Sequence, residues 1–160
     1  MEAYVKTCYS LEDTKNLAKH FADITKENGC FVNLFGDIGA GKTAFVRYVA
    51  EALDIKEKVT SPSFTILNEY HTGEIPIYHF DLYRLENVGI KTITDELREY
   101  SDGKCLTFVE WAEFSQGEVP FDRIEINVTY DDDDNRCYAF SAIGESTQYI
   151  IKEMEKKNEK

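Results

Sequence analysis

The sequence predicts an α/β fold with a mostly parallel central sheet, flanking helices and a C-terminal antiparallel hairpin. Apolar strand-like runs alternate with amphipathic helical segments, a glycine-rich loop joins one such run to a helix, and two strictly alternating segments follow at residues 123–130 and 136–144. The 160 residues are 42% apolar and 30% charged. These values are typical of one globular domain. We therefore expect a single domain over residues 1–160, with residues 152–160 as a frayed charged tail.

The N-terminal segments predict a strand, a helix, a second strand and a second helix. A short strand at residues 3–10 leads into an amphipathic segment, which predicts a helix with Ser10 as its N-cap and Asp13 in the reciprocal capping position. The run CFVNLF at residues 30–35 is short and mostly apolar, which is typical of a strand buried in a parallel sheet. Residues 41–54 continue as a helix.

The middle of the chain predicts two more strands, a helix and a fifth strand. Residues 59–70 and 75–85 are strand-like and are separated by the turn sequence HTGE. Residues 93–103 have the pattern of a helix that a glycine could end. The apolar run at residues 104–111 then predicts a buried strand.

The C-terminal segments have a different pattern. Residues 123–130 and 136–144 alternate between apolar and polar side chains, with the sequence DDDDN between them. This pattern predicts a β-hairpin with one wetter face. We interpret Asp131–Asp134 as a solvated turn rather than a metal site, because four adjacent carboxylates cannot easily converge on one ion. The segment from residue 145 is expected to close the chain as a helix.

The charge of the chain limits the classes of function. Asp and Glu outnumber Lys and Arg by 30 to 18, giving a net charge of −12. A protein that binds nucleic acid by itself needs a basic face, so we expect no autonomous DNA binding and, in any nucleic-acid pathway, action through a protein partner. No apolar run approaches the ~20 residues of a membrane-spanning helix, and the first residues lack the pattern of a secretory signal. We therefore expect a cytoplasmic protein without membrane association.

The stretch GDIGAGKTAF at residues 36–45 carries the clearest chemical signal. It matches the pattern G-x-x-x-x-G-K-[ST] and lies between an apolar strand and a helical segment. Its glycines let successive backbone N–H groups face phosphate oxygens, and the dipole of the following helix adds positive potential. Lys42 supplies a charge for the β- and γ-phosphates, and the Thr43 hydroxyl can bind Mg²⁺. The sequence therefore predicts a nucleotide-binding P-loop and a P-loop NTPase fold.

Two acids follow strand-like runs. Asp81 ends IYHFD and Glu110 ends CLTFVE. Ligands gather at the carboxyl ends of parallel strands, so both acids could face a Mg²⁺ beside Thr43; the alternative is that either acid only caps the next helix. His79 shares a strand face with Asp81, and a functional and a structural role remain equally open. The hydroxyls of the TSPSF segment, residues 60–64, could sense a γ-phosphate or belong to an ordinary strand entry.

Missing features narrow the class of enzyme. The guanine-reading motif N-K-x-D is absent, which argues against a GTPase. The five arginines are not clustered as in the lid of a small-molecule kinase, which argues against such a kinase. A site without its own lid excludes water poorly, so we expect slow ATP hydrolysis that a partner completes or triggers. The alternatives are a small P-loop metabolite kinase and a nucleotide-dependent binding module that does not require hydrolysis.

Four segments together resemble a known family. GDIGAGKT, VTSPSFTILNEY, IYHFDLYRL and FVEWAE, in this order and spacing, resemble the bacterial tRNA threonylcarbamoyladenosine biosynthesis ATPases of the TsaE (YjeE) type. The resemblance implies a cytoplasmic, Mg²⁺-dependent ATPase that joins two protein partners of a threonylcarbamoyl transferase complex. That complex installs threonylcarbamoyl on the adenosine next to the anticodon of tRNAs reading codons that begin with A. ATP hydrolysis is expected to reset the complex, while a partner contacts the tRNA.

The resemblance also implies roles for individual residues. The catalytic residues would be Lys42, Asp81 and Glu110, and the metal would be held by Thr43, Glu110 and Asp81, with the direct ligand among the two acids undecided. One departure is Ser63, since the family often has SPT at that point of the loop. The residues expected to contact ATP are Ser10, Thr14, Gly36, Asp37, Gly39, Ala40, Gly41, Lys42, Thr43, Ala44, Ser61, Ser63 and Trp111.

Overall fold

The fold is seen in a computed structural model that describes residues 2–36, 41–83, 94–99, 103–115 and 119–158. In this part of the chain, seven strands form one sheet in the order β1-β7-β6-β2-β5-β4-β3. The strands are β1 (Glu2–Cys8), β2 (Cys30–Phe35), β3 (Leu67–Tyr70), β4 (Ile77–Asp81), β5 (Leu106–Glu110), β6 (Arg123–Tyr130) and β7 (Arg136–Ile143). The helices are α1 (Leu11–Thr25), α2 (Lys42–Ala52), α3 (Thr94–Glu99), the 3₁₀ helix η3 (Ala112–Ser115) and α4 (Gln148–Asn158).

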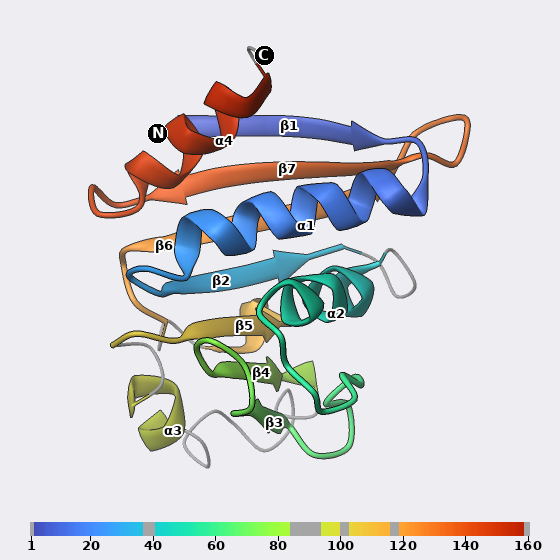
Figure 1. The fold of residues 1–160 in the computed structure, drawn as a ribbon. Helices are drawn as coiled ribbons and strands as arrows, with labels where there is room; N and C mark the ends of the chain where they lie inside the picture. The colour runs from blue at the N-terminus through green and yellow to red at the C-terminus, as the bar shows by residue number, and fades with distance from the viewer. Residues whose placement is uncertain (1, 37–40, 84–93, 100–102, 116–118, 159–160) are drawn as a thin grey trace.

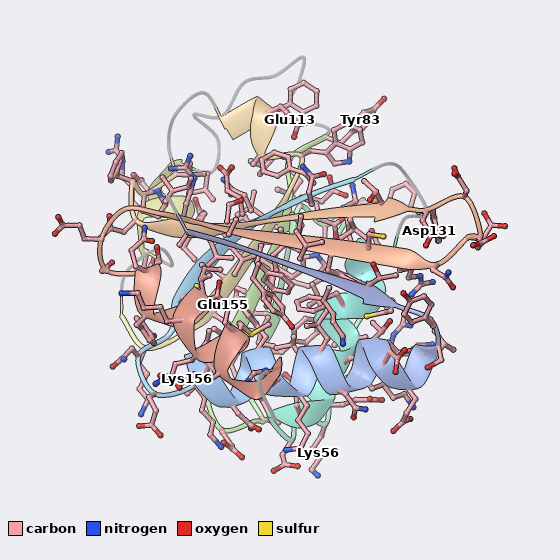
Figure 2. All side chains as sticks on the ribbon, turned by 90° about the horizontal axis from the view of Figure 1, so that it is seen from above. Lys56, Tyr83, Glu113, Asp131, Glu155 and Lys156 are labelled. Atoms are coloured by element: carbon pink, nitrogen blue, oxygen red, sulfur yellow. The ribbon has the colours of Figure 1, made fainter. Side chains whose placement is uncertain are left out.

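The elements form layers on the two faces of the sheet. Helices α1, α2 and α4 cover one face, as Figure 1 shows. The view from above shows Tyr83 and Glu113 on the side of the sheet opposite α1 and α4 (Figure 2). Strand β2 is buried on both sides, because Val32 and Leu34 pack in the larger core under the helices while Phe31 packs in the smaller core with residues of α3 and η3. Two-sided burial explains why this strand is almost continuously apolar.

The sheet is mixed rather than mostly parallel. Strands β6, β2, β5 and β4 run parallel to one another, whereas β1 with β7, β7 with β6, and β3 with β4 are antiparallel. The expectation of a mostly parallel sheet is therefore not confirmed, although the antiparallel C-terminal hairpin was expected. A hairpin forms each of the two outer parts of the sheet, and β1 adds to the outer edge of the C-terminal hairpin. The parallel centre nevertheless brings the carboxyl ends of β2, β5 and β4 to one edge.

Strand β3 is shorter than the sequence pattern predicts. Of the expected strand at residues 59–70, only Leu67–Tyr70 pairs with β4. The chain before it makes a turn in which the backbone N–H of Ile66 donates to the carbonyl of Pro62 at 2.8 Å. Proline has no N–H for a ladder, which favours a loop here. This loop carries Ser61 and Ser63 to the carboxyl end of β4.

The first helix begins as its sequence predicts. The Ser10 hydroxyl accepts from the N–H of Asp13 at 3.1 Å. The Asp13 carboxylate accepts from the N–H of Tyr9 at 3.0 Å, one residue before the N-cap. These two bonds satisfy donors at the start of the helix. Further along, Leu17 and Phe21 are buried against the sheet.

The C-terminal hairpin and helix close the fold. Strands β6 and β7 pair antiparallel, and burial alternates along both, which confirms the predicted hairpin with one wetter face. Helix α4 continues to Asn158 and buries Met154 completely, so the expected fraying does not begin at residue 152. No helix in the described segments has both the length and the apolar character that crossing a membrane requires.

Candidate functional site

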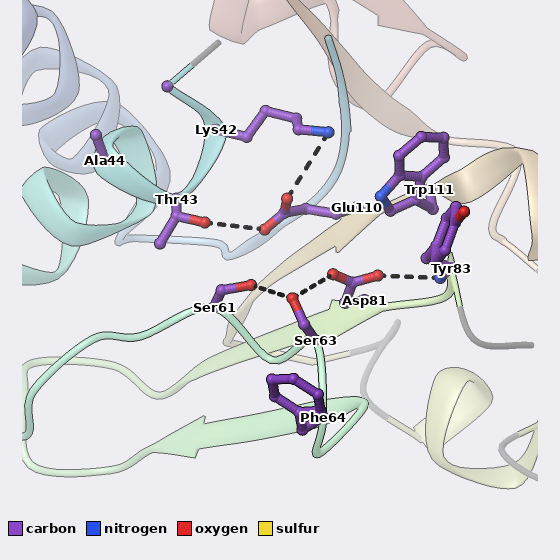
Figure 3. Close-up of a pocket in the computed structure, with 11 residues that line it drawn as sticks. Lys42, Thr43, Ala44, Ser61, Ser63, Phe64, Asp81, Tyr83, Glu110 and Trp111 are labelled. Carbon is purple, nitrogen blue, oxygen red and sulfur yellow. Dashed lines mark hydrogen bonds and ion pairs between the residues drawn. The ribbon is translucent and has the colours of Figure 1, made fainter. Parts of the chain in front are cut away.

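One pocket lies where the central parallel strands end. Strand register places Leu34 of β2 and Asp81 of β4 on either side of Glu110, the last residue of β5. Helix α2 begins beside them at Lys42. Figure 3 shows the side chains that line this pocket. Its volume is about 520 Å³. It is lined by Gly41, Lys42, Thr43, Ala44, Ser61, Ser63, Phe64, Asp81, Tyr83, Glu110 and Trp111.

Lys42 is a buried cation at this site. Its side chain is 7% exposed, and Nζ donates to the carbonyl oxygen of Gly36 at 2.8 Å. The same Nζ lies 3.9 Å from Oε1 of Glu110 and 5.0 Å from the centre of the Trp111 ring. A buried lysine must be compensated by such partners, because removing its charge from water is costly. The contacts hold the ammonium group beside the glycine-rich loop.

Glu110 connects Lys42 with two further side chains. Its Oε2 accepts from the Thr43 hydroxyl at 3.4 Å and from Nε2 of His79 at 2.6 Å. Thr43 comes from α2 and His79 from β4, so the carboxylate joins three elements at the sheet edge. Glu110 is 5% exposed, and His79 is fully buried. The carboxylate is thus held by contacts on both of its oxygens.

Asp81 belongs to a second set of contacts. Its Oδ1 accepts from the backbone N–H of Tyr83 at 3.0 Å, and its Oδ2 accepts from the Ser63 hydroxyl at 3.4 Å. The hydroxyls of Ser63 and Ser61 are 2.7 Å apart, which links the TSPSF loop to β4 (Figure 3). Burial raises the pKa of Asp81 despite the Tyr83 N–H, and the charge of nearby Glu110 acts in the same direction as burial.

The N-terminus of α2 approaches the C-terminal hairpin. Gly41 is the N-cap of the helix and has a φ of 110°, a left-handed conformation that favours glycine. A Cβ at this position would lie 3.2 Å from Cζ of Arg136, the first residue of β7. The guanidinium group therefore lies against the end of the glycine-rich loop. It adds a positive charge beside the positive end of the helix dipole.

Aromatic side chains surround the mouth of the pocket. The Trp111 ring lies 4.9 Å from Tyr83 and stacks on Phe114 at 6.0 Å. Trp111 has a φ of 60°, which for a bulky residue costs roughly 1–2 kcal/mol. Strained residues of this kind cluster at functional sites. Phe64, on the TSPSF loop, is 86% exposed.

The structure brings most of the predicted site residues together. Of the residues expected at the metal and the phosphates that lie in the described part, all except Gly36 line this one pocket, and Trp111 joins them. Gly36 contributes its carbonyl oxygen to Lys42. The residues Asp37, Gly39 and Ala40 of the predicted P-loop lie outside the described residues. The functional roles of all these residues stay predictions.

Ser10 and Thr14 line a different, smaller pocket. It has a volume of about 220 Å³ and also contains Arg136 and residues of the hairpin turn. Because Arg136 lies against Gly41, this smaller pocket adjoins the end of the glycine-rich loop. A nucleotide with its adenine at Ser10 and Thr14 and its phosphates at the glycine-rich loop would therefore have to pass Arg136.

Sequence reasoning missed three residues that the structure places at the site. Phe64 and Tyr83 lie within the TSPSF and HFDLY segments, and the segments themselves were a signal for them. Arg136 had no local signal, since it simply follows the turn of a hairpin. Its place depends on the pairing of β6 with β2, which brings the hairpin beside α2.

The donors at the larger pocket can be compared with the needs of a metal ion. Among the described residues, no group of three or more His, Cys, Asp and Glu side chains is arranged to hold a metal. Mg²⁺ is usually bound through one or two carboxylates with nucleotide phosphates and water. The Thr43 hydroxyl beside Glu110, with Asp81 on the adjacent strand, fits that requirement.

The fold and the site together define an α/β protein with a pocket of one lysine, two carboxylates and several hydroxyls at the ends of its parallel strands. The sequence matches the family model described as threonylcarbamoyl adenosine biosynthesis protein TsaE over residues 8–138. The chain belongs to this family, which confirms the resemblance noted in its sequence.

Individual relatives agree with this assignment. The tRNA threonylcarbamoyladenosine biosynthesis protein TsaE of Bacillus subtilis (strain 168) is 38% identical over 143 residues, which span 89% of this chain and 88% of the relative. The protein of the same name from Nostoc sp. is 37% identical over 129 residues, or 78% and 77% of the two chains. The crystal structure of Bacillus subtilis YdiB superposes with a TM-score of 0.83 at 33% identity, covering 98% of this chain and 97% of that one.

Proposed function

We propose that this protein is the ATP-binding and ATP-hydrolysing component of the machinery that makes threonylcarbamoyladenosine in tRNA. Membership of the TsaE family and the names of its relatives support a role in this pathway. The proposal of ATPase activity rests on one observation. Lys42 and Thr43 at the start of α2 lie together with Glu110 and Asp81 at the ends of two parallel strands. P-loop NTPases use this combination to hold and cleave a nucleoside triphosphate.

The phosphates would lie at the N-terminus of α2. The backbone N–H groups at the start of α2, from Gly41 to Thr43, and the helix dipole would favour an anion there, and Lys42 would exchange its contact with the Gly36 carbonyl for phosphate oxygens. Arg136 supplies a second cation at the same end of the helix. The base would extend toward Ser10 and Thr14 in the smaller pocket.

The metal would be Mg²⁺, held by Thr43 and Glu110, with Asp81 close by. When bound, Mg²⁺ neutralises charge on the phosphates and on the leaving group. Asp81 would orient the attacking water and accept its proton. Its raised pKa suits a proton acceptor, and its bonds to Ser63 and Tyr83 fix the direction of the carboxylate. Through Ser63, the TSPSF loop would sense the γ-phosphate.

Hydrolysis is proposed to be slow in the isolated protein and to reset a partner transferase complex. The net charge of −12 supports an indirect contact with tRNA, through protein partners that carry the transferase site. The exposed aromatic Phe64 at the pocket mouth offers a surface that such a partner could cover. We propose two protein partners, a cytoplasmic location and no membrane association.

The test is ATP hydrolysis by the purified protein, alone and with the two transferase-complex proteins of its own organism. We expect slow hydrolysis that increases when the partners are added and is lost in Lys42→Ala. Phosphate release that depends on a metabolite acceptor would instead favour a kinase. Normal tRNA modification over many turnovers by a variant that binds but does not hydrolyse ATP would favour a binding module.

A further inference from the structure

His79 is the buried polar residue that the proposed reaction leaves without a role. It lies on β4, two residues before Asp81, and both side chains therefore project from the same face of the strand. In the ladder with β5, His79 pairs with Phe108 and Asp81 pairs with Glu110. The imidazole thus approaches Glu110 diagonally across the two strands. Strand β4 therefore supplies both the Asp81 carboxylate and the imidazole that donates to Glu110.

The hydrogen bonds of the imidazole ring are unequal. Nε2 lies 2.6 Å from Oε2 of Glu110, whereas Nδ1 is buried and has no hydrogen-bond partner in the described part of the chain. An ionised carboxylate can only accept, so Nε2 carries the proton in this contact. The ring is 0% exposed. Within the described part of the chain, the one hydrogen bond of the imidazole ring is therefore with Glu110.

Glu110 needs such a contact to remain in place. Its neighbour across the ladder is another carboxylate, Asp81, and the two like charges repel. The Lys42 ammonium lies 3.9 Å away from Oε1, and the Thr43 hydroxyl approaches Oε2 at 3.4 Å. Both contacts are longer than the one from His79. When the nucleotide and metal bind, Lys42 and Thr43 would contact them in place of Glu110. The hydrogen bond from the imidazole would then remain.

We propose that His79 is a positioning residue, which holds the Glu110 carboxylate against Thr43 in the geometry that receives the metal–nucleotide complex. This inference rests on the proposed function, since it assigns Glu110 to the metal. Carboxylate ligands are commonly oriented by hydrogen bonds from outer residues, and losing such a partner lowers metal affinity roughly 10- to 100-fold. A purely structural His79 would affect folding stability but not the dependence of binding on Mg²⁺.

The test compares His79→Gln with His79→Leu. The glutamine amide can place an N–H donor where Nε2 lies, whereas leucine fills the space without a donor. ATP binding is measured from the emission of Trp111, the single tryptophan, with Mg²⁺ titrated at fixed ATP and also in EDTA. We expect His79→Leu to require roughly 10- to 100-fold more Mg²⁺, with unchanged affinity in EDTA, and His79→Gln to stay within a few-fold of the wild type.

Two controls separate positioning from stability. Ile77→Val removes volume from the same face of β4 without touching Glu110, and its Mg²⁺ dependence should match the wild type. In a Glu110→Gln background, His79→Leu should have no further effect on Mg²⁺ dependence, because the group on which it acts is gone. If leucine prevents folding, His79→Asn serves in its place, since its amide is too short to reach Oε2.

The outcomes are distinct. An unchanged Mg²⁺ requirement in His79→Leu would overturn the inference, as would an equal loss in His79→Gln and His79→Leu or an undiminished effect in the Glu110→Gln background. Wild-type protein that binds ATP with no dependence on Mg²⁺ would instead overturn the proposed metal site itself.

Discussion

The guanidinium group of Arg136 lies against the backbone of Gly41, although the two residues are far apart in the sequence. Nη1 of Arg136 is buried and has no hydrogen-bond partner among the described residues. A buried cationic donor without a partner, at the positive end of a helix, is suited to an anion. The contact thus extends the proposed phosphate site beyond the glycine-rich loop to the C-terminal hairpin.

The first prediction concerns this arginine. Arg136→Gln should weaken ATP binding roughly 10- to 100-fold, because a hydrogen bond to a charged group contributes about 1.5–3 kcal/mol. Calorimetric titration with ATP measures the change. The matched control is Arg123→Gln at the other end of the same hairpin, where the guanidinium pairs with Glu125 at 2.9 Å. Equal affinity in the two variants would remove Arg136 from the nucleotide site.

The second prediction separates the two carboxylates. Asp81→Asn should lower the hydrolysis rate roughly 10²- to 10⁴-fold, the range for losing a general base, and leave ATP affinity within a few-fold. Glu110→Gln should raise the Mg²⁺ concentration that ATP binding requires, since Glu110 and not Asp81 contacts Thr43. Steady-state hydrolysis and binding titrations are run on both variants. The reverse pattern would assign the metal to Asp81.

Much of this site follows from local sequence. Asp81 and Glu110 each end an apolar run, and parallel pairing of β4 with β5 makes such ends meet, so their proximity could be predicted. The same holds for Lys42 and Thr43, because the glycine pattern between a strand and a helix fixes their position.

Other features depend on contacts that no local pattern contains. Arg136 reaches Gly41 only because β6 joins the far side of β2, a pairing between distant segments. The alternation in residues 59–66 resembles a strand, but Pro62 cannot donate to a ladder, and this stretch instead carries Ser63 to Asp81. The sequence left a functional and a structural role for His79 equally open. Only the structure shows the short distance from its Nε2 to Glu110.

The third prediction tests the hydroxyl relay in the TSPSF loop. Ser63→Ala should lower the hydrolysis rate roughly 2- to 10-fold, because it removes one hydrogen bond to Asp81 of about 0.5–1.5 kcal/mol. Ser63→Thr keeps the hydroxyl and should retain the rate. Thr65→Ala is the control, since its hydroxyl bonds to Asn68 at 2.7 Å and not to the site. A rate loss of the same size in Thr65→Ala would indicate a general effect on the loop.

The fourth prediction uses the contact between Lys42 and Trp111. The Nζ atom lies 5.0 Å from the ring centre, and phosphates should draw it away. Trp111 emission should therefore change on addition of ATP. Lys42→Met should change the emission of the free protein and abolish most of the response to nucleotide. Lys15→Met is the control, because that lysine lies over Tyr48 instead. An ATP response that survives in Lys42→Met would show that another contact reports binding.

The last prediction concerns stability and pH at the hairpin turn, where Asp131 acts as a cap. Its Oδ1 accepts from the backbone N–H groups of Asp133 and Asn135, both at 2.9 Å. The Asn135 N–H contributes most to lowering the pKa of Asp131 below its ordinary value. A carboxyl whose pKa is lowered by folding stabilises the fold above its unfolded pKa of about 3.9, and this stability is lost as the pH falls through the folded pKa.

Asp131→Asn should therefore unfold at a lower urea concentration than the wild type at pH 7, and the difference should shrink as the pH falls through the folded pKa of Asp131, because the wild-type carboxyl then becomes neutral as well. The control is Asp132→Asn, which removes a neighbouring charge of the same turn from an exposed side chain. Urea unfolding at pH 7 and below the folded pKa measures the change. A constant difference between Asp131→Asn and the wild type across this range would mean that the shape of the turn, and not the charge of Asp131, stabilises the hairpin.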